Sequence, residues 1–83
     1  MTFLLFVYKI VKNPYNIPMK ILLWEKRKQK NLTLIELSKL TDLGKSTLND
    51  LENEKYSPTM QQMEQIAKGM NLKITDLFDS EYK

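Results

Sequence analysis

The sequence predicts an all-α fold of five short helices that follow an extended N-terminal arm. From Met19 onward, apolar residues recur at spacings of three and four, which is typical of helices packed on a common core. Polar breaks of about two to six residues separate these segments, a usual connection length in compact all-α domains. Pro14 and Pro18 form an extended linker, because each proline disfavours helix at the residue before it. We therefore predict an arm and linker over residues 1–18 and one helical domain over residues 19–83.

Capping residues give the helix boundaries. Thr33 and Glu36 have the Thr-x-x-Glu spacing of a capping box, and Thr59 with Gln62 repeats it. Asp42 tolerates the positive φ of a sharp turn. The expected helices cover about residues 20–30, 33–41, 45–53, 59–70 and 74–79.

The inward faces of these helices form the expected core. The apolar residues assigned to it are Leu23, Trp24, Ile35, Leu37, Leu40, Leu43, Leu48, Leu51, Met63, Ile66, Ala67, Met70, Leu77 and Phe78. We interpret the tryptophan and methionines among them as packing residues rather than as a cofactor-binding cluster.

Composition excludes several classes of function. Eighty-three residues allow one domain with a modest core. The chain has no cysteine and no histidine, so we expect no cofactor and no metal site. We also expect no enzyme activity, because no carboxylate pair lies beside a base and the two glycines cannot form a phosphate loop.

The net charge is +3, and the basic excess lies in residues 19–56, with eight basic and six acidic side chains. A cytoplasmic location is expected.

The N-terminal arm is apolar on both faces of any strand that it forms. One face would carry Phe3, Leu5 and Val7, and the other Leu4, Phe6, Tyr8 and Ile10. It is shorter than the roughly 20 apolar residues of a membrane span and lacks the features of a secretory signal, so we expect no membrane association. We predict an antiparallel strand that pairs with its mate across a homodimer. The alternatives are a local helix, a disordered arm, or an upstream extension with a native start at Met19.

Four segments in order resemble the Cro/C1-type (XRE-family) helix-turn-helix domain, which has a lambda-repressor-like fold. They are LTLIELSKLTDL, GKSTLNDLENEK, SPTMQQMEQIAKGMN and ITDLF, and the resemblance covers residues 23–78. It implies a DNA-binding domain of five helices, usually a homodimer on a palindromic operator in double-stranded DNA. The second helix of the motif is then expected in the major groove, where each base pair shows its own donor and acceptor pattern.

The resemblance also implies roles for individual residues. The candidates for contacts with base edges are Lys45, Ser46, Thr47, Asn49 and Asp50. Lysine can approach the O6 and N7 atoms of guanine, asparagine can pair with adenine, and aspartate helps only as an acceptor from cytosine. The candidates for phosphate contacts are Thr33 with its helix N-terminus, Asn53, Lys55 and Tyr56. Arg27 and Glu52 are expected to form a structural ion pair that sets the angle of the recognition helix.

Three positions depart from the family pattern. Leu34 stands where the family usually has a glutamine that contacts the DNA backbone, so that contact is missing or Leu34 contacts a thymine methyl group or a partner. Gly44 replaces the usual serine cap and caps slightly less well. Lys73 replaces a capping residue, so the last helix is expected to start late.

Two functions therefore compete. The first is a small transcriptional regulator, most simply a repressor, that binds a specific DNA sequence. The second is a protein-interaction module, antitoxin-like or an anti-regulator, which the apolar arm, Leu34 and the low net charge favour. For single residues, Lys45 and Lys55 can also be solvated lysines, Tyr56 can pack on the helix exit, and Asp50 can have an intramolecular partner.

Overall fold

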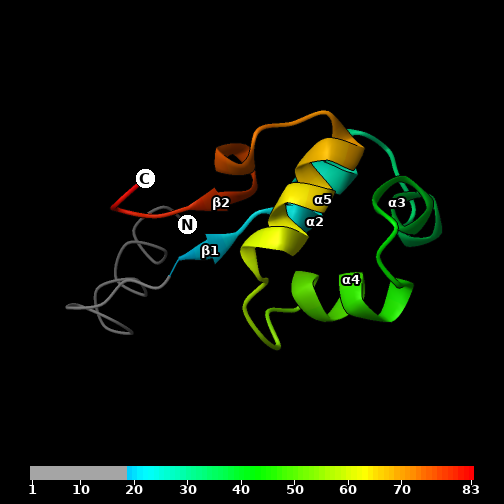
Figure 1. Cartoon of the computed structure of the whole chain (residues 1–83), viewed down its shortest axis with the longest axis horizontal. Coiled ribbons are helices and arrows are strands. Elements are labelled where there is room, and N and C mark those ends of the chain that lie inside the picture. Colours follow the sequence, from blue (N-terminus) through cyan, green and yellow to red (C-terminus); the bar gives the residue numbers. More distant parts are fainter. Residues whose placement is uncertain (1–18) are drawn as a thin grey trace, which may run out of the picture.

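A computed structural model describes residues 19–83, which form a helical domain with one small sheet (Figure 1). The predicted strand and strand exchange of the arm lie outside the described residues. The elements in chain order are β1 (Lys20–Ile21), α2 (Leu23–Gln29), α3 (Leu34–Thr41), α4 (Lys45–Glu52), α5 (Met60–Met70), the 3-10 helix η1 (Ile74–Leu77) and β2 (Phe78–Asp79).

Capping boxes start two of the helices, as the sequence predicts. At α3, the Thr33 hydroxyl accepts from the Glu36 N–H at 3.0 Å, and the Glu36 carboxylate accepts from the Thr33 N–H at 2.9 Å. Thr59 and Gln62 repeat this arrangement at α5. Each pair satisfies N–H groups that have no partner inside the helix. The Asp42 turn adopts the expected left-handed conformation, with φ 62°.

The core lies where α3 packs against α4 and α5. Most of the apolar residues expected inside are buried there. The fully buried large side chains are Leu23, Leu37, Leu48, Leu51, Ile66 and Leu77. Methionine and alanine side chains of α5 complete the core, and Leu34, Leu43 and Phe78 pack against it half-buried.

The predicted inner face of α3 was wrong at two positions. Ile35 is 54% exposed and Leu40 is 51% exposed. The inward stripe instead contains Leu34, Leu37 and Thr41, which are three and four residues apart as one face of a helix requires. Thr41 can lie inside because its hydroxyl donates to the Leu37 carbonyl at 2.8 Å.

Trp24 was also assigned wrongly to the core and is 49% exposed. Its neighbours Leu23 and Arg27 occupy the inner face of α2, and successive helix residues point about 100° apart. The Trp24 ring instead lies 5.7 Å from the Lys28 ammonium, as in a cation–π pair.

The two short strands were not expected and change both ends of the domain. Lys20 pairs with Asp79 and Ile21 with Phe78 in an antiparallel sheet. For this reason the first helix starts at Leu23 rather than near residue 20. The last helix is likewise a single 3-10 turn that ends at Leu77.

Lys73 does not delay the last helix. The Asp76 carboxylate accepts from the Lys73 N–H at 2.9 Å, so η1 begins directly after Lys73. Asp76, inside η1, therefore caps the start of this helix. The family pattern instead gives that role to the residue at position 73, before the helix.

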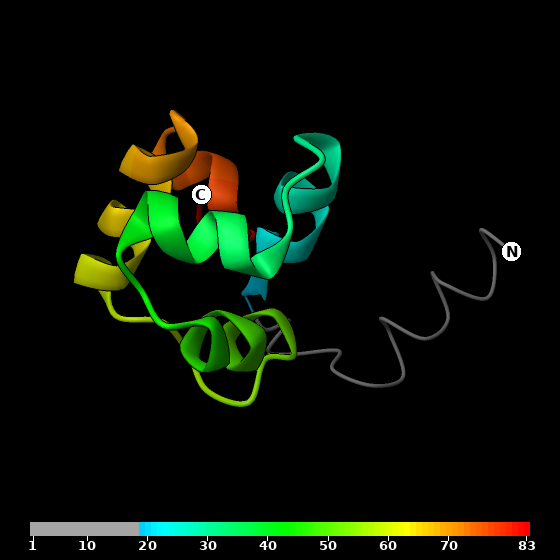
Figure 2. The same ribbon diagram turned by 90° about the vertical axis from the view of Figure 1, so that its right-hand side faces the viewer.

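The arrangement leaves α4 at one edge of the domain. The β1–β2 sheet and α3 lie on opposite sides of α2 and α5 in Figure 1. In the perpendicular view of Figure 2, α4 again runs along the lower edge, with α3 crossing above it. One side of α4 thus packs on the core while the other faces outward.

Candidate nucleic-acid interface

The outward side of α4 is polar over its whole length. Lys45, Ser46 and Asn49 are exposed, and Asp50 is half-buried. At about 100° per residue these four positions fall within one arc of the helix, opposite the buried Leu48 and its neighbour Leu51. Thr47 lies at the margin of this arc and is half-buried. Four of the five candidate base-contacting residues therefore share one face.

The turn before α4 holds that face in place. The Ser38 hydroxyl donates to the Leu43 carbonyl at 2.6 Å, and the Leu43 N–H donates to the Thr41 hydroxyl at 3.3 Å. Asp42 reverses the chain between them in the left-handed conformation. Gly44 begins α4 without a side-chain cap, so these turn contacts, rather than a capping residue, fix its start.

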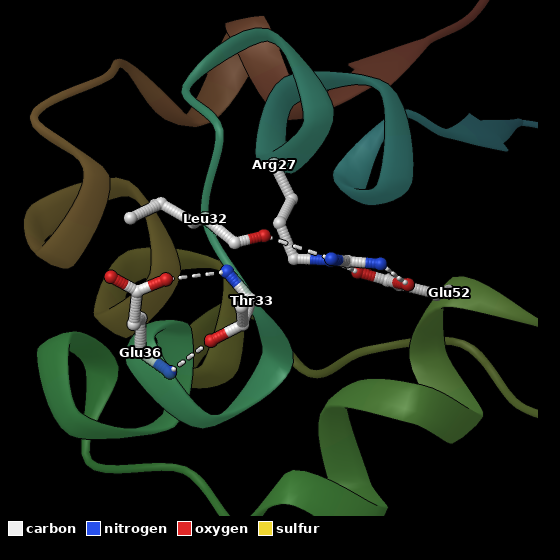
Figure 3. A network of polar contacts seen from close by, with 5 residues as sticks. All are labelled: Arg27, Leu32, Thr33, Glu36 and Glu52. Carbon is white, nitrogen blue, oxygen red and sulfur yellow. Dashed lines mark hydrogen bonds and ion pairs between the residues drawn. The ribbon is translucent and has the colours of Figure 1, made fainter.

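Arg27 connects α2 to the end of α4, as Figure 3 shows. Its guanidinium donates to both carboxylate oxygens of Glu52, from Nε at 2.6 Å and from Nη2 at 3.0 Å. Its Nη1 also donates to the Leu32 carbonyl at 2.9 Å, in the link between α2 and α3. The side chains are only 10% and 5% exposed. Hydrogen bonding to Glu52 raises the pKa of Arg27 above its usual value, so the guanidinium remains charged.

The N-terminus of α3 lies near the first turn of α4. A depression of about 500 Å³ is lined by residues from both and from the end of α2, namely Arg27, Lys28, Asn31, Leu32, Thr33, Leu34, Ile35 and Lys45. The first N–H groups of a helix have no partner within it and carry a partial positive charge. Lys28 and Lys45 add two cations to this depression. Lys28 was not among the expected phosphate contacts, because the basic run Lys26-Arg27-Lys28-x-Lys30 is more often a solvated face than a contact surface.

Glu36 places a negative charge in the same helix turn. Its carboxylate accepts from the Thr33 N–H, which therefore is not available to a ligand. The hydrogen bonds with Thr33 lower the pKa of Glu36 below its usual value. The backbone amide of Thr33 is thus occupied, and its hydroxyl accepts from the Glu36 N–H, while the residue as a whole is exposed at the surface.

The remaining candidates for phosphate contacts follow the C-terminal end of α4. Asn53, Lys55 and Tyr56 are all exposed, and Tyr56 is 45% exposed rather than packed away. The Lys55 ammonium lies 3.4 Å from the Asp50 carboxylate. The structure therefore brings one base-contact candidate and one phosphate-contact candidate into direct contact.

Two structural observations bear on other classes of function. In residues 19–83 no helix is long and apolar enough to span a membrane. Within the same residues, acidic side chains do not gather in threes to form a metal-binding group.

Comparison with known proteins identifies the fold. Residues 25–77 match the helix-turn-helix family, which is most of the domain and more than half of the chain. The chain belongs to the Cro/C1-type helix-turn-helix family. Domains of this family are DNA-binding parts of transcription regulators.

The chain is also similar to the immunity repressor protein of Bacillus phage phi105. The two are 27% identical over 55 residues, which is 66% of this chain and 38% of the phage protein. The chain therefore spans well under half the length of that repressor.

Proposed function

We propose that the protein is a transcriptional repressor that binds a specific double-stranded DNA sequence through α4. The observation that carries this proposal is the continuous polar face of α4 at the edge of the domain, with exposed lysines near both of its ends. A helix of this kind fits the major groove, which is wide enough to admit it. The name of the phage relative, an immunity repressor, supports the choice of repression.

Base reading is assigned to the outward arc of α4. Lys45 is the strongest candidate, because it lies at the start of the helix and can donate to O6 and N7 of guanine. Asn49 lies one turn further on and can pair with adenine. Ser46 and Thr47 are small donors and acceptors that tolerate several bases.

Phosphate contacts are assigned to both sides of this arc. On one side are the Thr33 hydroxyl and the first amides of α3, with Lys28 and Lys45 lining the same depression. On the other side, Asn53, Lys55 and Tyr56 are exposed after the end of α4. Contacts at both ends would hold the helix in register on the duplex without reading sequence themselves.

A homodimer on a palindromic operator fits the size of this surface. α4 has eight residues and offers few side chains to base edges, so a single copy would read only a short DNA sequence. Helix-turn-helix dimers overcome this by binding two half-sites about one helical turn apart. We therefore propose two copies related by a twofold axis.

Selection of bound duplexes from a random pool at near-physiological salt tests the function. We expect an enriched palindrome whose half-sites lie about 10 base pairs apart, with affinity that falls steeply as salt rises. Enrichment of no sequence, together with no retention of duplex at low salt, would contradict the proposal.

Exposed apolar side chains favour a second candidate, a protein-interaction module. Ile35, Leu40 and Met60 are all more than half exposed, although such residues are also common singly on protein surfaces. If this function is correct, duplex DNA will not bind, and a protein partner will protect these three residues from solvent.

A further inference from the structure

Asp50 is an unusual residue for a surface that approaches DNA. It lies on the outward arc of α4 beside Asn49, and its side chain is 34% exposed. A carboxylate in this position meets the negative potential of the phosphates. It can gain a hydrogen bond from DNA only where a cytosine amino group is presented to it.

In the free protein Asp50 already has a partner. The Lys55 ammonium lies 3.4 Å from Asp50 Oδ1, and the Lys55 N–H donates to the Asp50 carbonyl at 3.0 Å. Glu54, in the left-handed conformation with φ 55°, turns the chain so that Lys55 comes back beside Asp50. The backbone of this turn therefore keeps the two side chains close to each other.

Lys55 can exchange Asp50 for a phosphate as the partner of its ammonium group. Its side chain is 65% exposed, so the ammonium is free to move, and exposed ion pairs of this kind contribute little to stability. When Lys55 leaves, the Asp50 carboxylate loses its counter-charge at the moment when DNA phosphates approach. Binding of Lys55 to DNA therefore costs free energy, and the size of this cost depends on whether Asp50 gains a new hydrogen-bond partner.

We propose that Asp50 and Lys55 form an exchangeable ion pair that lowers affinity for non-specific DNA, an inference that rests on the proposed function. On a random duplex, Lys55 binds a phosphate and Asp50 is left unpaired. On the correct site, a cytosine amino group replaces Lys55 as the partner of Asp50. Asp50 is therefore a specificity-determining residue whose effect passes through Lys55.

The salt dependence of binding separates this mechanism from simple repulsion. Each phosphate neutralised by a lysine changes the slope of log K against log salt by about 0.9. In the wild-type protein the freed Asp50 carboxylate takes up a cation from solution, which cancels part of that release. With Asp50→Asn this uptake is absent, so the slope on random duplex should steepen, by less than the roughly 0.9 of a full phosphate contact because a single carboxylate holds cations weakly.

The test measures binding of the full chain to a random duplex and to its selected site over a range of salt concentrations. Asp50→Asn should raise affinity for the random duplex roughly fivefold at low salt, and affinity for the selected site by less. Glu64→Gln is the matched control, because it removes one exposed negative charge from α5 and should leave both affinities nearly equal to wild type. In a Lys55→Gln background, Asp50→Asn should no longer change the slope.

The outcomes distinguish the two proposals. A steeper slope for Asp50→Asn only when Lys55 is present supports the exchange. The exchange is contradicted, and DNA binding retained, if Asp50→Asn behaves like Glu64→Gln or steepens the slope equally in both backgrounds. If the wild-type protein retains neither duplex, the proposed function fails and the exchange fails with it.

Discussion

Arg27 and Glu52 form a two-pronged ion pair, with Nε–Oε2 and Nη2–Oε1 distances of 2.6 Å and 3.0 Å. The pair joins the first helix to the last residue of α4, and Arg27 also holds the Leu32 carbonyl. Both side chains are almost fully buried, so each has little access to solvent as an alternative partner. The contact therefore restrains the end of the proposed recognition helix relative to the N-terminus of α3.

Breaking this pair should destabilise the domain strongly. Arg27→Met leaves the Glu52 carboxylate buried and unpaired, and we expect the free energy of unfolding to fall by about 3–5 kcal/mol. The double variant Arg27→Met/Glu52→Leu should recover much of that loss, because an apolar pair removes the uncompensated charge. Urea denaturation of the wild type, the two single variants Arg27→Met and Glu52→Leu, and the double variant gives the coupling energy. Additive losses would show that the two residues act independently.

Gly69 should not tolerate alanine, although alanine normally favours a helix. A Cβ at this position would lie 2.6 Å from the Leu40 carbonyl oxygen, a backbone atom. We expect Gly69→Ala to lower stability by about 1–3 kcal/mol through overpacking, against a helix-propensity gain of about 1 kcal/mol. The exposed neighbour Lys68→Ala is the control for thermal unfolding. A higher melting temperature for Gly69→Ala would show that α5 and α3 accommodate the added methyl group, and would contradict this prediction.

The capping box of α3 should make stability depend on acid pH. The pKa of Glu36 is lowered in the folded state, mainly by its hydrogen bonds with Thr33, from an ordinary value of 4.5. The folded state therefore gains stability from Glu36 above that value, and loses it as the pH falls through the lowered pKa. Comparison with Glu36→Gln by urea unfolding from about pH 7 to about pH 2.5 checks this sign. The wild type should lose stability relative to the variant on acidification, and a constant difference would contradict the assignment.

Lys45→Ala should weaken the selected DNA site and relax its sequence at one position. The expected loss is about 1–3 kcal/mol of binding free energy, confined to duplexes that carry the preferred base. Lys39→Ala removes the same charge from an exposed position on α3 and serves as the control in a fluorescence binding assay. An equal loss on every duplex would mean that Lys45 contacts phosphate and does not read a base.

Local chemistry explains which parts of the fold could be predicted from the sequence. Capping boxes and left-handed turns involve residues within a few positions of each other, and those at Thr33, Asp42 and Thr59 are present. The β1–β2 pairing joins residues almost sixty positions apart, and two-residue strands have no periodicity to detect. Long-range contacts of this kind have no local signal in a single sequence.

In the candidate site, too, local geometry could be predicted from the sequence and long-range packing could not. The outward arc of α4 follows from helix geometry once Leu48 and Leu51 are assigned to the core. The inner face of α3 was ambiguous, because apolar residues at 34, 35, 37 and 40 allow two stripes and only packing selects one. Lys28 lies in the depression beside Lys45 because of how α2, α3 and α4 pack together, and a single sequence carries no signal for that packing.

The central claim is that the outward face of α4 contacts bases, and NMR titration of labelled protein with its selected duplex tests it most directly. We expect the largest amide shifts, with intermolecular contacts to base protons, at Lys45, Ser46 and Asn49, while exposed residues of α5 such as Glu64 and Lys68 remain unchanged. Shifts concentrated on α5, or none on α4 at saturating duplex, would contradict the claim.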